Sequence, residues 1–154
     1  MSIYNTPLEE RFGEKLEELR EGKNMTREQL AEQVGLTARH IAALERGERR
    51  PTLNTMEKLL RAQFPDLAAK YVHQFALLFL DLQKKCDSAE ISTKALDLRG
   101  MLDALRLIRR GIPAGAALDM GITNKAFDSY EQGLIRDVIA ARIPAKLDAG
   151  KLFA

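Results

Sequence analysis

The residues best suited to bind a ligand lie between Leu36 and Pro51, where arginines are concentrated. An arginine guanidinium offers its donors in a planar fork that fits phosphate and carboxylate oxygens. Residues 1–65 carry eleven Lys/Arg and eleven Asp/Glu, but six of these acids precede Gly22. We therefore expect a dipolar domain with a positive face opposite an acidic one, although the whole chain has a net charge of only +2. The basic segment sets Arg39, Arg46, Arg49 and Arg50 against Glu45 and Glu48.

Groups that could support catalysis or bind a metal are few. The chain has two histidines, His40 and His73, one cysteine, Cys86, and no cluster of carboxylates in a predicted loop. These residues provide no nucleophile with a matching base, no metal cluster and no disulfide. We therefore expect a protein that is not an enzyme and has no cofactor and no metal. Cys86 is expected to be an inert thiol near a helix end, and His73 a packed core residue.

The composition is that of an ordinary soluble protein. The 154 residues, 45% hydrophobic and 30% charged, are enough for one core or two small ones. The N-terminus has no apolar signal region, and the longest apolar run, residues 75–80, is far shorter than the roughly 20 residues of a membrane span. These features predict a cytoplasmic protein with no membrane segment.

Apolar residues recur at helical spacing along the chain, and no segment has a convincing strand pattern. The prediction is an all-α fold. Thr26 and Gln29 form a capping box, Gly35 suits the left-handed conformation that ends a helix, and Thr37 can cap the next one. A first domain, residues 1–65, should contain helices at about 7–22, 26–35, 37–46 and 52–64.

A longer helix is expected from Asp66 to about Lys85, and its middle is apolar nearly all round. Such a helix needs two surfaces to pack against, so we expect a self-association surface here. Residues 66–93, with a linker at 87–93, form this predicted interface region, and residues 94–154 form a C-terminal helical extension. Its helices are expected at 96–110, through Met120, and from a cap at Thr123 or Asn124 to Ile143.

The tight turn from Val34 to Thr37 joins two short helices, and a DNA major groove about 12 Å wide accepts one helix at a time. Residues 10–62 resemble the Cro/C1-type repressor domain, also called the xenobiotic-response-element family of helix-turn-helix regulators. The stretches that carry the resemblance are Leu19-Arg20-Glu21, residues 25–31, residues 34–37, and Ile41-Ala42-Ala43-Leu44-Glu45-Arg46-Gly47 followed by Pro51.

This resemblance implies a lambda-repressor-like domain of four to five helices that binds double-stranded DNA in a prokaryotic regulator. It implies that the helix Thr37–Arg46 enters the major groove and that Arg20 and Glu45 form a structural pair. The implied base contacts are Ala38, Arg39, His40, Ala42 and Ala43. The implied phosphate contacts are Thr26, Arg27, Thr37, Arg46, Arg49 and Arg50.

Several of these roles have alternatives. Arg39 either pairs with the two acceptors of guanine or touches phosphate alone, and His40 either contacts DNA or is a solvated surface residue. Arg49 and Arg50 either clamp phosphates or form a solvated charge run. Arg27 stands where the family usually has glutamine. Because alanines dominate the outer face of the helix, we expect modest direct specificity, with much of the affinity coming from phosphates and dimerisation.

Residues 98–122 look similar to the C-terminal helical segment of MoxR-like ATPases. The chain has no phosphate-binding loop of the Gly-x-x-x-x-Gly-Lys type, so the similarity implies a helical interaction module and no hydrolysis. The alternative is a helical extension peculiar to this chain. Arg99, Arg106 and Arg110 lie near one face and could meet DNA, an acidic partner, or Asp97 and Asp103.

The sequence thus supports two functions. The first is a dimeric repressor that binds half-sites about one helical turn apart, with dimerisation through the helix 66–85 and the C-terminal helices. The alternative is an antitoxin-like or adaptor module that uses the same fold to bind a protein partner and binds DNA weakly. The alanine-rich outer face of the third helix favours this alternative.

Overall fold

The computed structural model describes residues 7–153, and the regular structure in this range is helical apart from one isolated bridge between Leu67 and Phe153. The all-α prediction is confirmed; residues 1–6 of the expected first domain and residue 154 lie outside the described residues. The α-helices are α1 (Leu8–Gly22), α2 (Arg27–Val34), α3 (Ala38–Glu45), α4 (Leu53–Gln63), α5 (Ala69–Asp87), α6 (Leu98–Arg109), α7 (Ala114–Gly121), α8 (Ser129–Arg142) and α9 (Ala149–Leu152). Short 3-10 turns, η2 (Thr93–Ala95) and η3 (Thr123–Lys125), precede α6 and α8.

Local capping fixes the bounds of the first helices. Thr26 Oγ1 accepts from Gln29 N at 3.1 Å while Gln29 Oε1 accepts from Thr26 N at 2.8 Å, so both halves of the capping box form. Gly35 ends α2 with φ +84°, a conformation that other residues rarely adopt. Together these two devices set the tight turn between α2 and α3.

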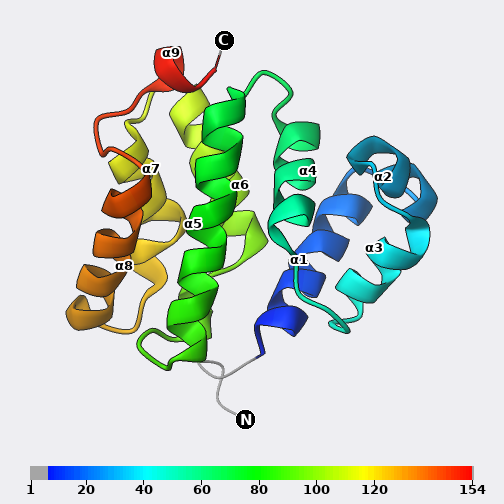
Figure 1. Cartoon of the computed structure of the whole chain (residues 1–154), viewed down its shortest axis with the longest axis horizontal. Coiled ribbons are helices and arrows are strands. Elements are labelled where there is room, and N and C mark those ends of the chain that lie inside the picture. The colour runs from blue at the N-terminus through cyan, green and yellow to red at the C-terminus, as the bar shows by residue number, and fades with distance from the viewer. Residues whose placement is uncertain (1–6, 154) are drawn as a thin grey trace.

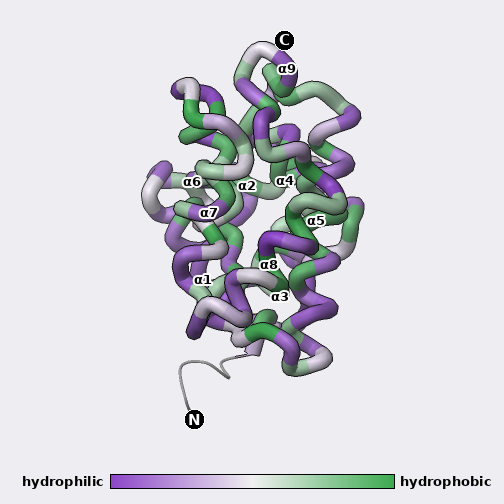
Figure 2. The backbone as a smooth tube through the Cα atoms, turned by 90° about the vertical axis from the view of Figure 1, so that its left-hand side faces the viewer, coloured by the Kyte–Doolittle hydropathy of each residue, from purple (hydrophilic) through white to green (hydrophobic). Residues whose placement is uncertain are grey.

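One hydrophobic core cluster joins the first four helices to the C-terminal half of the chain. Phe12 of α1 meets Phe79 of α5 edge to face, with ring centroids 6.0 Å apart. Hydrophobic and hydrophilic stretches alternate along the helices in Figure 2, because each helix turns one side toward this core. Figure 1 shows α2 and α3 at one end of the molecule and α7 and α8 at the other, with α1, α4, α5 and α6 between them.

The apolar surface of α5 is covered within the chain. α5 packs against α4 on one side and α8 on the other, and Val72, Phe75, Leu78 and Leu82 are buried. Both of its apolar sides therefore have intramolecular partners. A self-association surface along this helix stays a prediction, as does dimerisation itself.

The last long helix begins later than expected. Asp128, not Thr123 or Asn124, caps α8, and its Oδ1 accepts from Glu131 N at 2.9 Å. Thr123 is instead fully buried in the 3-10 turn η3. Sequence analysis did not consider Asp128, and the burial of Thr123 keeps that residue from capping α8.

His73 also differs from its expected place. Its side chain is 47% exposed, and its Nδ1 lies 3.4 Å from Glu57 Oε2. The buried stripe of α5 runs through Val72, Phe75 and Phe79, which turns position 73 outward. Cys86 lies in the last turn of α5, where burial raises the pKa of the thiol to about 12.

Within the described part of the chain, no helix has both the length and the apolar character needed to cross a membrane.

Candidate nucleic-acid interface

The outer face of α3 is open to solvent. The helix packs inward through Ile41 and Leu44, which are fully buried against α1 and α2. Thr37 caps it by accepting from His40 N at 3.0 Å. The C-terminal helices α7 and α8 lie at the opposite end of the molecule and leave this face uncovered (Figure 1).

A buried carboxylate anchors the end of α3. The Glu45 side chain has no solvent exposure, and it accepts from Arg20 Nε at 2.7 Å and from Arg20 Nη2 at 3.1 Å. The two residues matched to the family's structural pair are thus in contact, and this hydrogen bonding raises the pKa of Arg20. Arg27 Nε donates to the same carboxylate at 3.0 Å, a contact that sequence analysis missed. Glu45 therefore joins α1, α2 and α3 at one point.

Most of the predicted DNA contacts gather around one shallow hollow on the outer face of α3. His40 is partly buried there, and this burial lowers the pKa of its imidazole, with the charges of Arg49 and Lys58 acting in the same direction. Lys58 of α4 also donates to Gly35 O at 2.9 Å. It is a cation close to His40 that sequence analysis missed. The hollow is lined by Thr37, Arg39, His40, Ala42, Ala43, Arg46, Glu48 and Arg49.

Four of the predicted contacts, Ala38, Thr26, Arg27 and Arg50, lie outside this hollow. Ala38 is partly buried and packs against the core. Thr26 and Arg27 lie at the start of α2, where the Thr26 hydroxyl serves the capping box and the Arg27 guanidinium is held by Glu45. Arg27 is still one-third exposed. A phosphate role for Thr26 and Arg27 therefore stays a prediction.

Arg50 is held by carboxylates, so its role as a phosphate contact stays a prediction. Its Nε bonds to Glu9 in the first turn of α1, and its Nη1 donates to Asp87 Oδ2 at the end of α5 at 2.8 Å. These carboxylates, Asp87 foremost, raise the pKa of Arg50. Arg50 therefore faces the C-terminal half, while Arg49 lines the hollow on α3.

Gly13 is a structural residue of the interface that sequence analysis missed. A Cβ at this position would lie 2.6 Å from Glu45 O and closer still to Leu44 O. The missing side chain lets α1 cross the last turn of α3 at backbone contact distance. The only signal in the sequence is a glycine in the middle of a helical pattern, which by itself is weak.

Comparison with known families identifies the first part of the chain. A family model described as helix-turn-helix matches residues 16–62, which span the C-terminal part of α1, all of α2 and α3, and α4 except its last residue. Residues 16–62 are a Cro/C1-type helix-turn-helix domain. Domains of this type bind double-stranded DNA in transcription regulators. Neither a curated protein nor a solved structure matched the chain. The helix-turn-helix match ends before α5, so the similarity of residues 98–122 to MoxR-like ATPases stays a prediction.

Proposed function

We propose that the protein is a transcriptional repressor that binds double-stranded DNA as a homodimer, with α3 in the major groove. Occupying its operator is sufficient for repression, so the proposal requires no catalytic step. We expect it to act in the cytoplasm of a prokaryote. The proposal rests on the helix-turn-helix domain and on the surface around α3.

The observation that carries the proposal is the distribution of arginines that have no carboxylate partner. Ten of the fourteen arginines, all of which lie within residues 7–153, form an ion pair with Asp or Glu. Three of the other four border the hollow on α3. A guanidinium without a carboxylate can accept a phosphate or a guanine edge with no ion pair to break. The four arginines are Arg39, Arg46 and Arg49 at α3, and Arg110 at the end of α6.

Within this surface, we assign Arg39 to the bases and Arg46 and Arg49 to phosphates. Arg39 lies in the first turn of α3, the part of a recognition helix that reaches base edges. Ala42 and Ala43 present only methyl groups, which suit the methyl of thymine but donate no hydrogen bond. We therefore expect a short, partly degenerate recognition sequence, which selection from random duplexes will test.

Replacing Arg39 by alanine is expected to weaken binding to the selected duplex about tenfold to hundredfold, because one bidentate base contact is lost. The preference at one base pair should relax at the same time. Arg49→Ala should instead weaken binding to all duplexes alike and reduce the slope of log affinity against log salt by about 1. Fluorescence anisotropy on selected and scrambled duplexes measures both effects.

The control for this series is Arg110→Ala, which removes an equally unpaired arginine from the C-terminal half. It should leave DNA affinity unchanged. An equal loss in Arg39→Ala and Arg110→Ala would refute the assignment of Arg39. A wild-type affinity that is weak and nearly independent of salt would support the alternative of a protein-binding adaptor.

The surface we propose for the homodimer is the outer side of α8. Tyr130 is 73% exposed, and Leu134 and Val138 line a groove of about 620 Å³ between α8 and α5. Among residues 7–153, Asp137 and Lys84 on the groove's rim form no ion pair. In the dimer we propose, a two-fold axis through the groove pairs the Lys84 of each copy with the Asp137 of the other.

Leu134→Asp is expected to convert the dimer to a monomer. The substitution buries one unpaired carboxylate from each copy in the interface, because both copies use the same surface. Light scattering coupled to size exclusion measures the mass. Met120→Asp is the control, since Met120 is 53% exposed and lies on α7, outside the groove. A wild-type protein that stays monomeric at high micromolar concentration, with and without DNA, contradicts the dimer.

This dimer changes the expected operator. In Figure 1, α8 and α3 lie at opposite ends of the molecule. Pairing through α8 therefore holds the two recognition helices at the far ends of the assembly. We now expect half-sites separated by more than the single helical turn that the sequence alone implied.

A further inference from the structure

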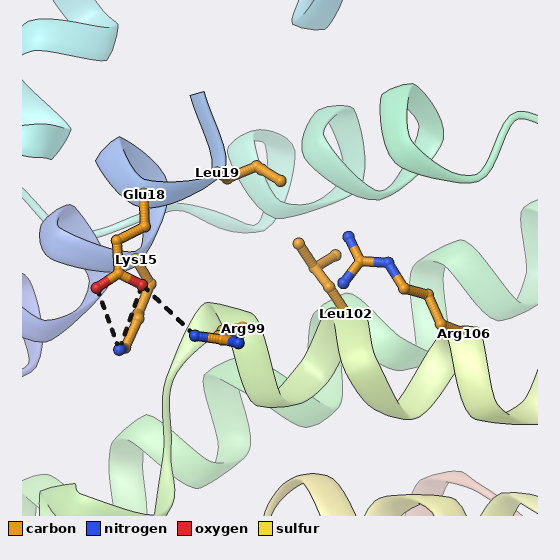
Figure 3. A pocket seen from close by; sticks show the side chains of 6 residues that line it. All are labelled: Lys15, Glu18, Leu19, Arg99, Leu102 and Arg106. Carbon is orange, nitrogen blue, oxygen red and sulfur yellow. Dashed lines mark hydrogen bonds and ion pairs between the residues drawn. The ribbon is translucent and has the colours of Figure 1, made fainter. Parts of the chain in front are cut away.

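A slot between α1 and α6 combines positive charge at both ends with an apolar middle. α6 presents Arg99, Leu102 and Arg106 on one face, and α1 presents Lys15 and Leu19 toward it. Figure 3 shows Leu19 and Leu102 facing each other, with Arg99 on one side and Arg106 on the other. The slot is open to solvent on one side and has a volume of about 260 Å³. This is slightly below the range of roughly 300–1,000 Å³ that is usual for ligand pockets, so it suits a small ligand.

The end of the slot at Arg99 is largely neutralised. Glu18 Oε2 lies 3.4 Å from Lys15 Nζ and 3.9 Å from Arg99 Nη1. These contacts, drawn as dashed lines in Figure 3, place a carboxylate between the two cations. An anionic group at this end would meet Glu18 before it met either cation. The end at Arg99 is therefore a poor site for an anion.

The end at Arg106 carries an excess of positive charge. Lys23, which directly follows α1, donates to the neutral Gln63 Oε1 at 2.6 Å and has no carboxylate partner among residues 7–153. Arg106 has one, Asp103 at 2.9 Å, but Arg99 shares that carboxylate at 3.7 Å. Burial lowers the pKa of Lys23, and the charge of Arg106 lowers it further. The two cations therefore repel each other without an anion between them.

An unsatisfied donor belongs to the residue that Lys23 contacts. Gln63 Nε2 is buried and has no hydrogen-bond partner within the described chain. The oxygen of the same amide accepts from Lys23 Nζ, so this unpaired nitrogen lies close to Lys23. Buried donors in native proteins nearly always have an acceptor, and one that lacks it is a feature to be explained.

We propose that this slot binds a small molecule with one anionic head group, a carboxylate or a phosphate, and a short apolar body. The head lies between Lys23 and Arg106. The body lies on Leu19 and Leu102. Glu18 at the far end excludes a second anionic group. This site is independent of the DNA-binding function proposed above, and neither proposal requires the other.

Isothermal titration with hexyl phosphate and with hexanoate tests the site on the full chain. At least one of these amphipathic anions should bind saturably with one-to-one stoichiometry. Hexanol lacks the head group and inorganic phosphate lacks the apolar body, so each should bind at least about tenfold more weakly. If neither amphipathic anion binds at millimolar concentration, or if hexanol or inorganic phosphate binds as well as they do, the proposal is wrong.

Variants locate the site. Lys23→Gln and Arg106→Gln should each raise the dissociation constant about tenfold, because each removes one charge-assisted hydrogen bond to the head group. Arg110→Gln, one turn further along α6, removes the same charge outside the slot and should bind like the wild type. An equal loss in Arg106→Gln and Arg110→Gln would show nonspecific attraction and overturn the proposal.

Methyl NMR on the wild-type chain gives a second measurement that depends on no variant. Titration of the bound probe should shift the methyl resonances of Leu19 and Leu102. The methyl resonances of Leu134, which line the groove at α8, should stay in place. Shifts confined to Leu134 would place the ligand elsewhere and exclude this slot.

Discussion

Glu45→Ala is expected to lower the free energy of unfolding by about 3 kcal/mol, at the lower end of the range for breaking a buried ion pair. The carboxylate has no solvent exposure, and its loss leaves the guanidinium groups of Arg20 and Arg27 without their acceptor. The effect stays near the lower end because Arg27 is one-third exposed and water can replace part of its contact. Urea denaturation followed by circular dichroism measures the change.

Matched substitutions separate this role from loss of charge alone. Glu48→Ala removes an exposed carboxylate three residues away and should change stability by no more than about 0.5 kcal/mol. Arg20→Ala should destabilise more than Arg27→Ala, since Arg20 makes two of the three hydrogen bonds to Glu45. If Glu45→Ala and Glu48→Ala have equal stability, Glu45 does not anchor α3.

Gly13→Ala is expected to destabilise the protein by about 1–3 kcal/mol, the usual range for overpacking. The new methyl group would overlap the carbonyl oxygens of Leu44 and Glu45, which belong to the backbone and cannot rotate away. Relief requires α1 to move off the end of α3. The folded fraction of the variant should therefore also bind DNA more weakly than the wild type.

The control for Gly13 is Gly133→Ala. Gly133 lies inside α8, and a Cβ there would meet no atom within 4 Å. On helix propensity alone, replacing glycine by alanine stabilises a helix by up to about 1 kcal/mol. The two substitutions should therefore shift the urea midpoint in opposite directions. A shift of Gly13→Ala toward higher stability would show that the close contact of α1 with α3 is absent.

Predictions from the sequence succeeded where a residue determines the structure of a turn only a few positions away. The capping box at Thr26, the left-handed Gly35 and the N-cap Thr37 each act on a neighbouring turn, so α2 and α3 could be placed closely. The start of α8 was misplaced because Thr123 and Asp128 are equally good capping residues. Only the burial of Thr123 in the folded chain distinguishes them.

Contacts between distant segments could not be predicted in the same way. Arg49 and Arg50 are identical in type and adjacent in sequence, yet Arg50 alone meets Glu9 and Asp87. The apolar residues on all sides of α5 correctly indicated that two other surfaces pack against this helix. It could not indicate whether those surfaces belong to another copy or, as found, to α4 and α8 of the same chain.

The edge-to-face contact between Phe12 and Phe79 has a practical consequence for work with truncated protein. A fragment cut after the helix-turn-helix match would leave Phe12 facing water, along with the side of α4 that α5 covers. It would also remove the carboxylate of Asp97 that holds Arg11 at 3.3 Å. Such a fragment should aggregate or melt early, so experiments on DNA recognition require the entire polypeptide.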